Sequence, residues 1–211
     1  MRGRQTFRIC VAYALAVNLS FAATPTIGIA SAIGTFIVNS NEVDGNANLF
    51  EGSKVKTGKA SSQVLLQNGA SLTLGLNSAG MVYRDHLLLE SGATKVDNMS
   101  GYRVEAGSYR IEQDQPASQA VVRLEAGMVE IGALAGSLRV LDSKGALLTR
   151  IGTGTASAFQ AGGSGGGQGT PNPNVNTRTR YRTAAALLLA ATLAGLGLAV
   201  DAILQPAPTS P

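Results

Sequence analysis

Residues 24–160 predict an all-β domain, and three features of this segment support that fold class. No helical apolar period is sustained along it, whereas short apolar alternations recur. Residues 71–76 alternate strictly, which places three leucines on one face of a strand. Gly and Asn interrupt the alternations at short intervals, and Asn68-Gly69 suits a tight hairpin because both residues tolerate positive φ.

These alternations predict a series of short strands joined by turns. Turns are expected at Ser91-Gly92, Ser100-Gly101 and Lys144-Gly145, which are typical turn residues. Trp is absent and aromatic residues make up only 5%, so we expect a core of Val, Leu, Ile and Ala. The expected strands cover residues 64–66, 71–76, 82–83, 87–89, 102–104, 109–111, 121–124, 128–131, 138–141 and 147–151.

A degenerate repeat runs through the middle of the segment, at residues 89–96, 104–111 and 124–131. Each unit consists of an apolar residue, Glu, a small residue, Gly, three further residues and then Val or Ile. The glycine permits a backbone state that a Cβ would hinder, so each unit predicts a strand, a turn and a strand. Such units predict a short β-solenoid or a sandwich-like domain with solenoid character. The unequal spacings of 15 and 20 residues argue against an ideal β-helix.

The charge distribution argues against nucleic-acid binding. Residues 24–160 carry 11 basic and 12 acidic residues, although the whole chain has a formal net charge of +4. Phosphate binding needs clustered Lys and Arg, so the domain is not expected to bind nucleic acid. The other six basic residues lie beside apolar runs near the two ends, which indicates membrane targeting; they are Arg2, Arg4, Arg8, Arg178, Arg180 and Arg182.

Residues 1–22 have the organisation of a secretory signal peptide. Basic residues precede a mostly apolar stretch over residues 9–19, and Ser20 and Ala22 supply the small residues of a cleavage site. We expect export and cleavage after Ala22. An uncleaved N-terminal anchor is the alternative, because apolar character resumes over residues 27–38. Cys10 is the only cysteine, so neither an intrachain disulfide nor a cysteine-based zinc site is expected.

The C-terminal part of the sequence predicts a tether and a membrane anchor. Residues 161–182 are rich in Gly, Pro and Asn and predict a flexible linker. Residues 183–204 contain one charged residue and approach the length of about 20 residues that a transmembrane helix needs. A helix packed on protein is the alternative, and residues 205–211 predict a short disordered tail. The arginines before the apolar run favour a cytoplasmic flank, which opposes the orientation that export imposes.

The order of segments around residues 52–74 resembles the FecR-domain family. That family has a Gly-x-x-Val-x-Thr-Gly segment, which is matched here by Gly52, Val55, Thr57 and Gly58. In the family this segment is followed by an apolar strand, a glycine turn and a second alternating strand. The repeat units resemble the family's Leu-x-x-Gly-x-Val turns. The resemblance covers roughly residues 34–159 and implies an extracytoplasmic β module for protein or glycan contact.

The family's best-known members are transmembrane regulators whose cytoplasmic N-terminal segment controls a sigma factor. The expected signal peptide leaves no room for such a segment, and the expected anchor is C-terminal. Transcriptional signalling by this chain alone is therefore not expected.

No residue pattern predicts a catalytic, cofactor-binding or metal site. His86 is the only histidine and follows Asp85, but no Gly-x-Ser-x-Gly segment supplies a nucleophile. We therefore expect His86 to be a solvated turn residue. The lysines of a small basic patch are expected to lie on a solvated hairpin face rather than to bind an anionic glycan or lipid; they are Lys54, Lys56 and Lys59.

The glutamates of the repeat, Glu90, Glu105 and Glu125, could form an acidic ladder that binds a cation if the units stack. Stacked carboxylates repel one another, so ion pairs or solvation are expected instead. The nearby cations that could pair with them are Lys95, Arg103, Arg110 and Arg123.

Together these features predict a non-enzymatic module in the inner membrane with its domain facing the periplasm. The expected partners are the membrane, through the C-terminal helix, and an envelope protein or glycan, with a role in binding, scaffolding or envelope signalling. Two alternatives stay open. One is a structural envelope protein that forms homo-oligomers through exposed strand edges; the other, more remote, is a hydrolase.

Overall fold

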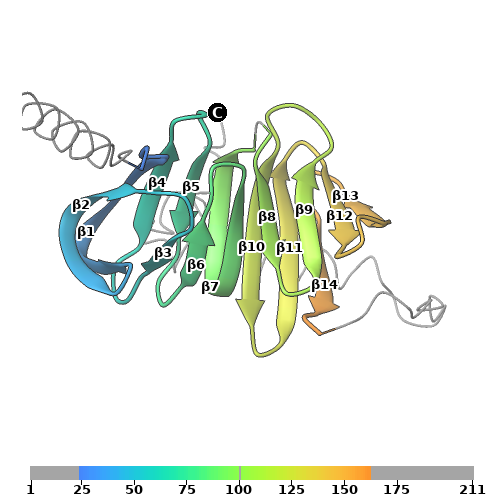
Figure 1. Cartoon of the computed structure of the whole chain (residues 1–211). Coiled ribbons are helices and arrows are strands. Elements are labelled where there is room, and N and C mark those ends of the chain that lie inside the picture. Colours follow the sequence, from blue (N-terminus) through green and yellow to red (C-terminus); the bar gives the residue numbers. More distant parts are fainter. Residues whose placement is uncertain (1–23, 100, 163–211) are drawn as a thin grey trace, which may run out of the picture.

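A computed structural model describes residues 24–99 and 101–162 of the chain (Figure 1). This part folds into fourteen β-strands, which confirms the all-β expectation. Within those two ranges no helix is long and apolar enough to cross a membrane. Several expectations lie outside the described residues: Cys10, the signal peptide (1–22), the linker beyond residue 162, the membrane helix (183–204) and the tail (205–211).

The strands of the described part are connected by hydrogen-bonded pairing into one sheet system. Among these strands only β7 and β8 pair in parallel. A solenoid needs parallel stacking of successive units, so the expected solenoid is replaced by an antiparallel architecture. The bounds are β1 (Gly28–Val38), β2 (Asn41–Leu49), β3 (Ser53–Lys56), β4 (Ser62–Leu66), β5 (Ser71–Leu74), β6 (Ala79–Val82), β7 (His86–Asn98), β8 (Arg103–Ala106), β9 (Tyr109–Gln113), β10 (Gln119–Glu125), β11 (Met128–Ala135), β12 (Leu138–Asp142), β13 (Leu147–Ile151) and β14 (Ala156–Gln160).

Six strands close into a small barrel. Each strand pairs with the next in the order β7, β5, β4, β1, β3 and β6, and the pairing of β6 with β7 closes the ring. Successive side chains of a strand point to opposite faces, so burial alternates along the barrel. On β4, for example, Val64 and Leu66 are buried in the apolar core, whereas Leu65 between them is exposed.

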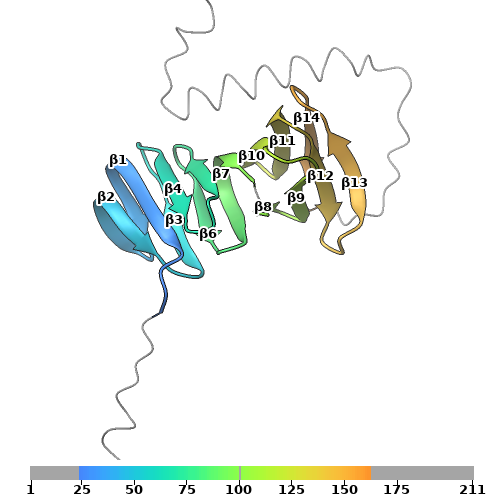
Figure 2. The same ribbon diagram turned by 90° about the horizontal axis from the view of Figure 1, so that it is seen from above.

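The strands that follow the barrel form two sheets that both start from β7 (Figure 2). One sheet continues through β8, β9, β12 and β13, and the other through β10, β11 and β14. The rings of Tyr109 on β9 and Phe159 on β14 lie 5.0 Å apart, and the Tyr109 hydroxyl donates to the carbonyl of Gln160 at 2.9 Å. The sandwich-like character expected from the repeat therefore describes this half of the domain.

Strand β7 belongs to both halves because it exchanges neighbours partway along its length. Its first part pairs with β6 and β8, and its second part with β5 and β10. The exchange occurs at Gly92, where an added Cβ would lie 2.3 Å from Ser78 Oγ. The ladders with β6 and β5 stop at Ser91 and Thr94, so the amide of Ala93 donates to Ser78 Oγ instead, at 2.9 Å.

This continuity of β7 corrects one part of the repeat. Ser91-Gly92 is not a turn, and the expected strand at residues 87–89 is part of a 13-residue strand. The glycines of the other two units do lie in tight hairpin turns, where the φ angles of Gly107 and Gly127 are +58° and +76°. The repeat therefore predicts the positive φ of its glycines but not the course of the chain at Gly92.

The hairpin expected at Asn68-Gly69 is present between β4 and β5, but its turn differs from the one expected. Only Gly69 has a positive φ, +86°, and the connection spans residues 67–70. The Asn68 side chain accepts a hydrogen bond from the amide of Ala70 at 3.0 Å and donates to the carbonyl of Arg84 at 2.8 Å. The third leucine of the alternation, Leu76, lies beyond β5 in an exposed loop.

The alternation pattern does not predict β1 and β2, nor β3 and β14. In β1 the period is hidden because Ile29 and Ile33 are exposed and a bulge between Ser31 and Thr35 shifts the register. Residues 27–38 therefore begin the β domain, which corrects their interpretation as the continuation of an N-terminal anchor.

We expect Gly92→Ala to destabilise the domain more than Gly45→Ala. Both glycines have positive φ, +83° and +86°, so alanine strains either backbone by about 1–2 kcal/mol. Only at Gly92 would the new Cβ also collide with Ser78, because nothing lies within 4 Å at Gly45. Urea unfolding should show a further loss of about 1–3 kcal/mol for Gly92→Ala. Equal losses in the two variants would contradict this account of the junction.

Candidate functional site

Two grooves of the described surface share Leu76 as a lining residue. The first has a volume of about 530 Å³ and lies along β7, between the β5–β6 loop and the β10–β11 hairpin. The second, of about 630 Å³, is lined by β1, β2, the start of β4 and the β3–β4 loop, including Ile33 and Lys59. Leu76 is 37% exposed and Ile33 is fully exposed, so an aliphatic side chain is accessible where the grooves adjoin and another in the second groove.

Buried hydroxyl groups fix the loop that carries Leu76. The Thr57 hydroxyl donates to the carbonyl of Gly75 at 2.5 Å and accepts from the amide of Ser78 at 2.8 Å. The amide of Thr57 donates to the carbonyl of Ser78, also at 2.8 Å. The amide of Asn77 donates to the carbonyl of Gly58 at 3.0 Å. The Thr-Gly pair of the FecR-like segment therefore positions one wall of the groove.

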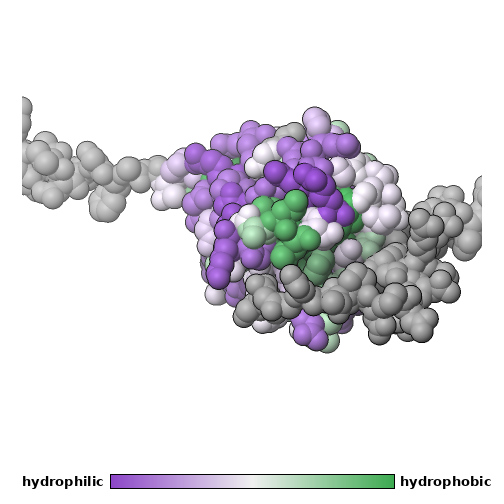
Figure 3. All heavy atoms as spheres, turned by 90° about the vertical axis from the view of Figure 1, so that its right-hand side faces the viewer, coloured by the Kyte–Doolittle hydropathy of each residue, from purple (hydrophilic) through white to green (hydrophobic). Residues whose placement is uncertain are grey.

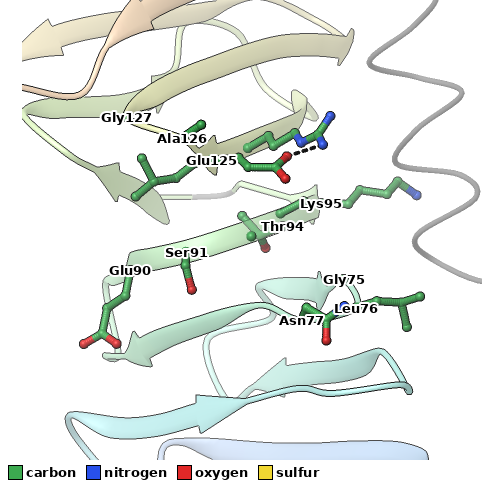
Figure 4. A pocket seen from close by; sticks show the side chains of 14 residues that line it. Gly75, Leu76, Asn77, Glu90, Ser91, Thr94, Lys95, Glu125, Ala126 and Gly127 are labelled. Carbon is green, nitrogen blue, oxygen red and sulfur yellow. Dashed lines mark hydrogen bonds and ion pairs between the residues drawn. The ribbon is translucent and has the colours of Figure 1, made fainter.

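The first groove has polar and backbone groups along its floor and walls. Figure 4 shows β7 along the middle, with Gly75, Leu76 and Asn77 on one side and Glu125, Ala126 and Gly127 on the other. No aromatic residue lines either groove in the described part of the chain. The lining thus offers short side chains and charged residues.

The repeat glutamates pair with cations rather than forming a ladder. Glu90 lies 2.6 Å from Lys54 Nζ, and Glu105 lies 3.2 Å from Arg103 and 3.3 Å from Arg110. Glu125 pairs with Arg123 inside the first groove. The expected ion pairs are thus present, with Lys54 in place of Lys95 as the partner of Glu90. Within residues 24–99 and 101–162 no cluster of three or more His, Cys, Asp or Glu could hold a metal ion.

The expected lysine patch is divided between different environments. Lys54 of β3 pairs with Glu90 as described, Lys56 of the same strand is exposed, and Lys59 lies in the following loop as part of the second groove. Only Lys59 therefore contributes to a concave surface.

His86 lies at the start of β7 and is less solvated than expected, with a side chain that is 18% exposed. Its ring stacks on Tyr83 with the centroids 4.3 Å apart, and Nδ1 lies 2.8 Å from Asp85 Oδ1. Arg103 Nη1 lies 3.0 Å from the other oxygen of Asp85. The hydrogen bond from His86, together with the charge of Arg103, lowers the pKa of Asp85 below its usual 3.8. Burial raises the pKa of the neighbouring Tyr102 hydroxyl.

A second accessible surface lies at the far end of the sandwich. In the described part of the chain β13 pairs only with β12, so its other edge is free. Leu147 and Leu148 on this strand are 47% and 41% exposed. Figure 3, which views the side of the molecule that carries β12 and β13, shows an apolar patch among hydrophilic residues.

The described residues thus form a small all-β domain with two adjoining surface grooves. No family model matches the sequence, and no curated protein matches it. Among solved structures the chain is similar to two crystal structures described as a "putative anti-sigma factor" from Parabacteroides distasonis, with 12% and 15% identity and TM-scores of 0.44 and 0.42. Each match covers 54% of this chain and little more than half of the other, 57% and 56%.

We expect Asp85→Asn to lower the free energy of unfolding near neutral pH by less than about 1 kcal/mol, because the Asp85 side chain is 55% exposed. The folded-state pKa of Asp85 lies below 3.8, so its contribution is present above that pH and is lost as the pH falls through the lower folded value. Urea unfolding at about pH 5 and at about pH 2.5 should therefore show a difference from the wild type that is smaller at the lower pH.

The control is Asp44→Asn, a change at an exposed position of β2. A difference at Asp85 that does not shrink in acid would contradict the assignment of this carboxylate as an ion-pair partner.

Proposed function

We propose that the chain is a non-enzymatic, membrane-tethered module that binds an extended segment of another envelope protein outside the cytoplasm. The observation that carries this proposal is the pair of grooves that adjoin at Leu76, with one wall held by the buried Thr57 hydroxyl. A rigid wall lowers the entropy that a binding surface loses when it is occupied.

The chemistry of the lining favours a polypeptide over a glycan. Exposed aliphatic side chains at Leu76 and Ile33 suit the side chains of a peptide. The ion pair of Arg123 with Glu125 adds one group of each sign. Sugar rings commonly stack on aromatic side chains, and the described lining of both grooves contains none.

The proposed location, an inner-membrane anchor with the domain in the periplasm, rests on the sequence. Residues 1–22 predict export, and residues 183–204 predict the anchor. The FecR-like order of segments over residues 34–159 supports a module that receives or relays contacts in the envelope.

A structural protein that self-associates is the second candidate, and the free edge of β13 favours it. An unpaired strand edge with exposed leucines can pair with the edge of another copy. The grooves favour a partner other than a second copy of the chain. The mass of the molecule bound to the chain therefore distinguishes the two candidate functions.

The hydrolase alternative has less support. In the described residues His86 is hydrogen bonded to Asp85, and no hydroxyl or thiol side chain bonds to its ring. A pair of this kind without a nucleophile is explained as part of the ion-pair cluster that also contains Arg103.

Photo-crosslinking in intact cells tests the proposed function. A photoreactive phenylalanine derivative replacing Leu76 should give a discrete adduct with an envelope protein, whereas the same residue at Glu42, exposed on β2, should not. Arg123→Glu in the Leu76 variant should lower the adduct yield because it replaces the ion pair with Glu125 by two neighbouring carboxylates in the groove.

The nature of the adduct decides between the candidates. An adduct that yields peptides of another protein supports the proposal. An adduct of twice the mass of the chain that yields only peptides of this chain would favour self-association, and an adduct whose added mass is removed by a glycan hydrolase would favour a glycan. No adduct at Leu76, or equal adducts at Leu76 and Glu42, would contradict the proposed function.

A further inference from the structure

The last described residues are held by hydrogen bonds at the rim of the first groove, and we call this contact the clamp. The amide of Ala161 donates to the carbonyl of Gly127 at 2.7 Å, and Gly127 lines that groove. The carbonyl of Ala161 accepts from the Ser108 hydroxyl at 3.1 Å. One residue earlier, the Gln160 carbonyl accepts from the buried Tyr109 hydroxyl.

A glycine of the repeat makes room for this clamp. A Cβ at Gly107 would lie 2.9 Å from the carbonyl oxygen of Ala161 and 3.1 Å from its Cα. The hairpins β8–β9 and β10–β11 therefore hold Ala161 from two sides, through Ser108 and Gly127. The described part of the chain consequently ends beside the groove, where the expected linker begins.

The length of the tether then limits how far the groove can lie from the expected anchor. Residues 163–182 separate the clamp from the segment expected to span the membrane. A Gly-rich coil of this length, as the sequence predicts, would have a root-mean-square span of roughly 22–27 Å and a fully extended length of about 66–72 Å. Such a linker would on average keep the first groove within a few tens of ångströms of the membrane surface.

We propose that the groove recognises a polypeptide segment close to the membrane surface, so that its partner is itself a membrane protein. This inference rests on the proposed function and on the anchor that the sequence predicts. Confinement of both partners to one membrane raises their effective concentration at the groove, which allows a small site to be occupied. The charges of both signs in the groove suit a charged segment beside a transmembrane helix of the partner.

Varying the tether length in the full chain tests this inference. The photoreactive residue is placed at Ala126, on the groove rim, and the linker is either native or extended by about 20 Gly and Ser residues after Gly169. Doubling the tether length should lower the adduct yield, by up to about threefold for a partner held beside the anchor, because effective concentration then falls roughly as the −3/2 power of length. The captured partner should be identified from the peptides of the adduct, and the uncrosslinked form of that protein should remain in the membrane fraction after an alkaline wash.

A control variant carries the same insertion after Ser210, beyond the expected anchor, and should leave the yield unchanged. An adduct whose yield does not depend on the linker, or whose partner is a soluble protein, would overturn the inference and leave the proposed function standing. Loss of the adduct in every variant, including the native linker, would remove the proposed function and the inference together.

Discussion

The contact between Ser78 and Gly92 is the constraint on which the two halves of the domain depend. Strand β7 can serve both the barrel and the sandwich only if it changes neighbours, and the change leaves the main chain at Ala93 without a strand partner on one side. Ser78 Oγ and the amide of Gly75 supply the missing hydrogen bonds, at 2.9 and 2.8 Å. This close approach has no room for a side chain at residue 92. The same contact holds the loop that forms one wall of the groove.

Much of the local structure can be predicted from the sequence, because alternation and turn chemistry act over a few residues. The leucines of β5 and the glycines at 107 and 127 are examples. The path of β7 cannot be predicted in this way. Ser91-Gly92 has the composition of a turn, and only the distant Ser78 explains why the strand continues there. Strand β1 is missed for another reason: its outward positions include isoleucines, so its burial pattern does not appear as alternation in the sequence.

The candidate site is less predictable than the fold because its walls come from segments far apart in the chain. The FecR-like segment does draw attention to Thr57 and Gly58, but its pattern gives no role for them; the structure shows that they position the loop around Leu76. The alternation places Leu76 on one strand face with Leu72 and Leu74, whereas it lies beyond the strand and is exposed between the two grooves. The glutamates of the repeat predict their surroundings better than Leu76 does. Carboxylates at one repeat position need cations nearby, and in the structure each of them pairs with Lys or Arg.

The side of the membrane on which the domain lies is the most direct test of this account. Lys144 is exposed on the β12–β13 hairpin and lies outside both grooves, so Lys144→Cys with Cys10→Ser gives a single accessible thiol. A membrane-impermeant maleimide added to intact spheroplasts should label this thiol as completely as it does after lysis. Labelling only after lysis would place the domain in the cytosol, in agreement with the arginines at 178, 180 and 182, and would contradict a binding role outside the cytoplasm.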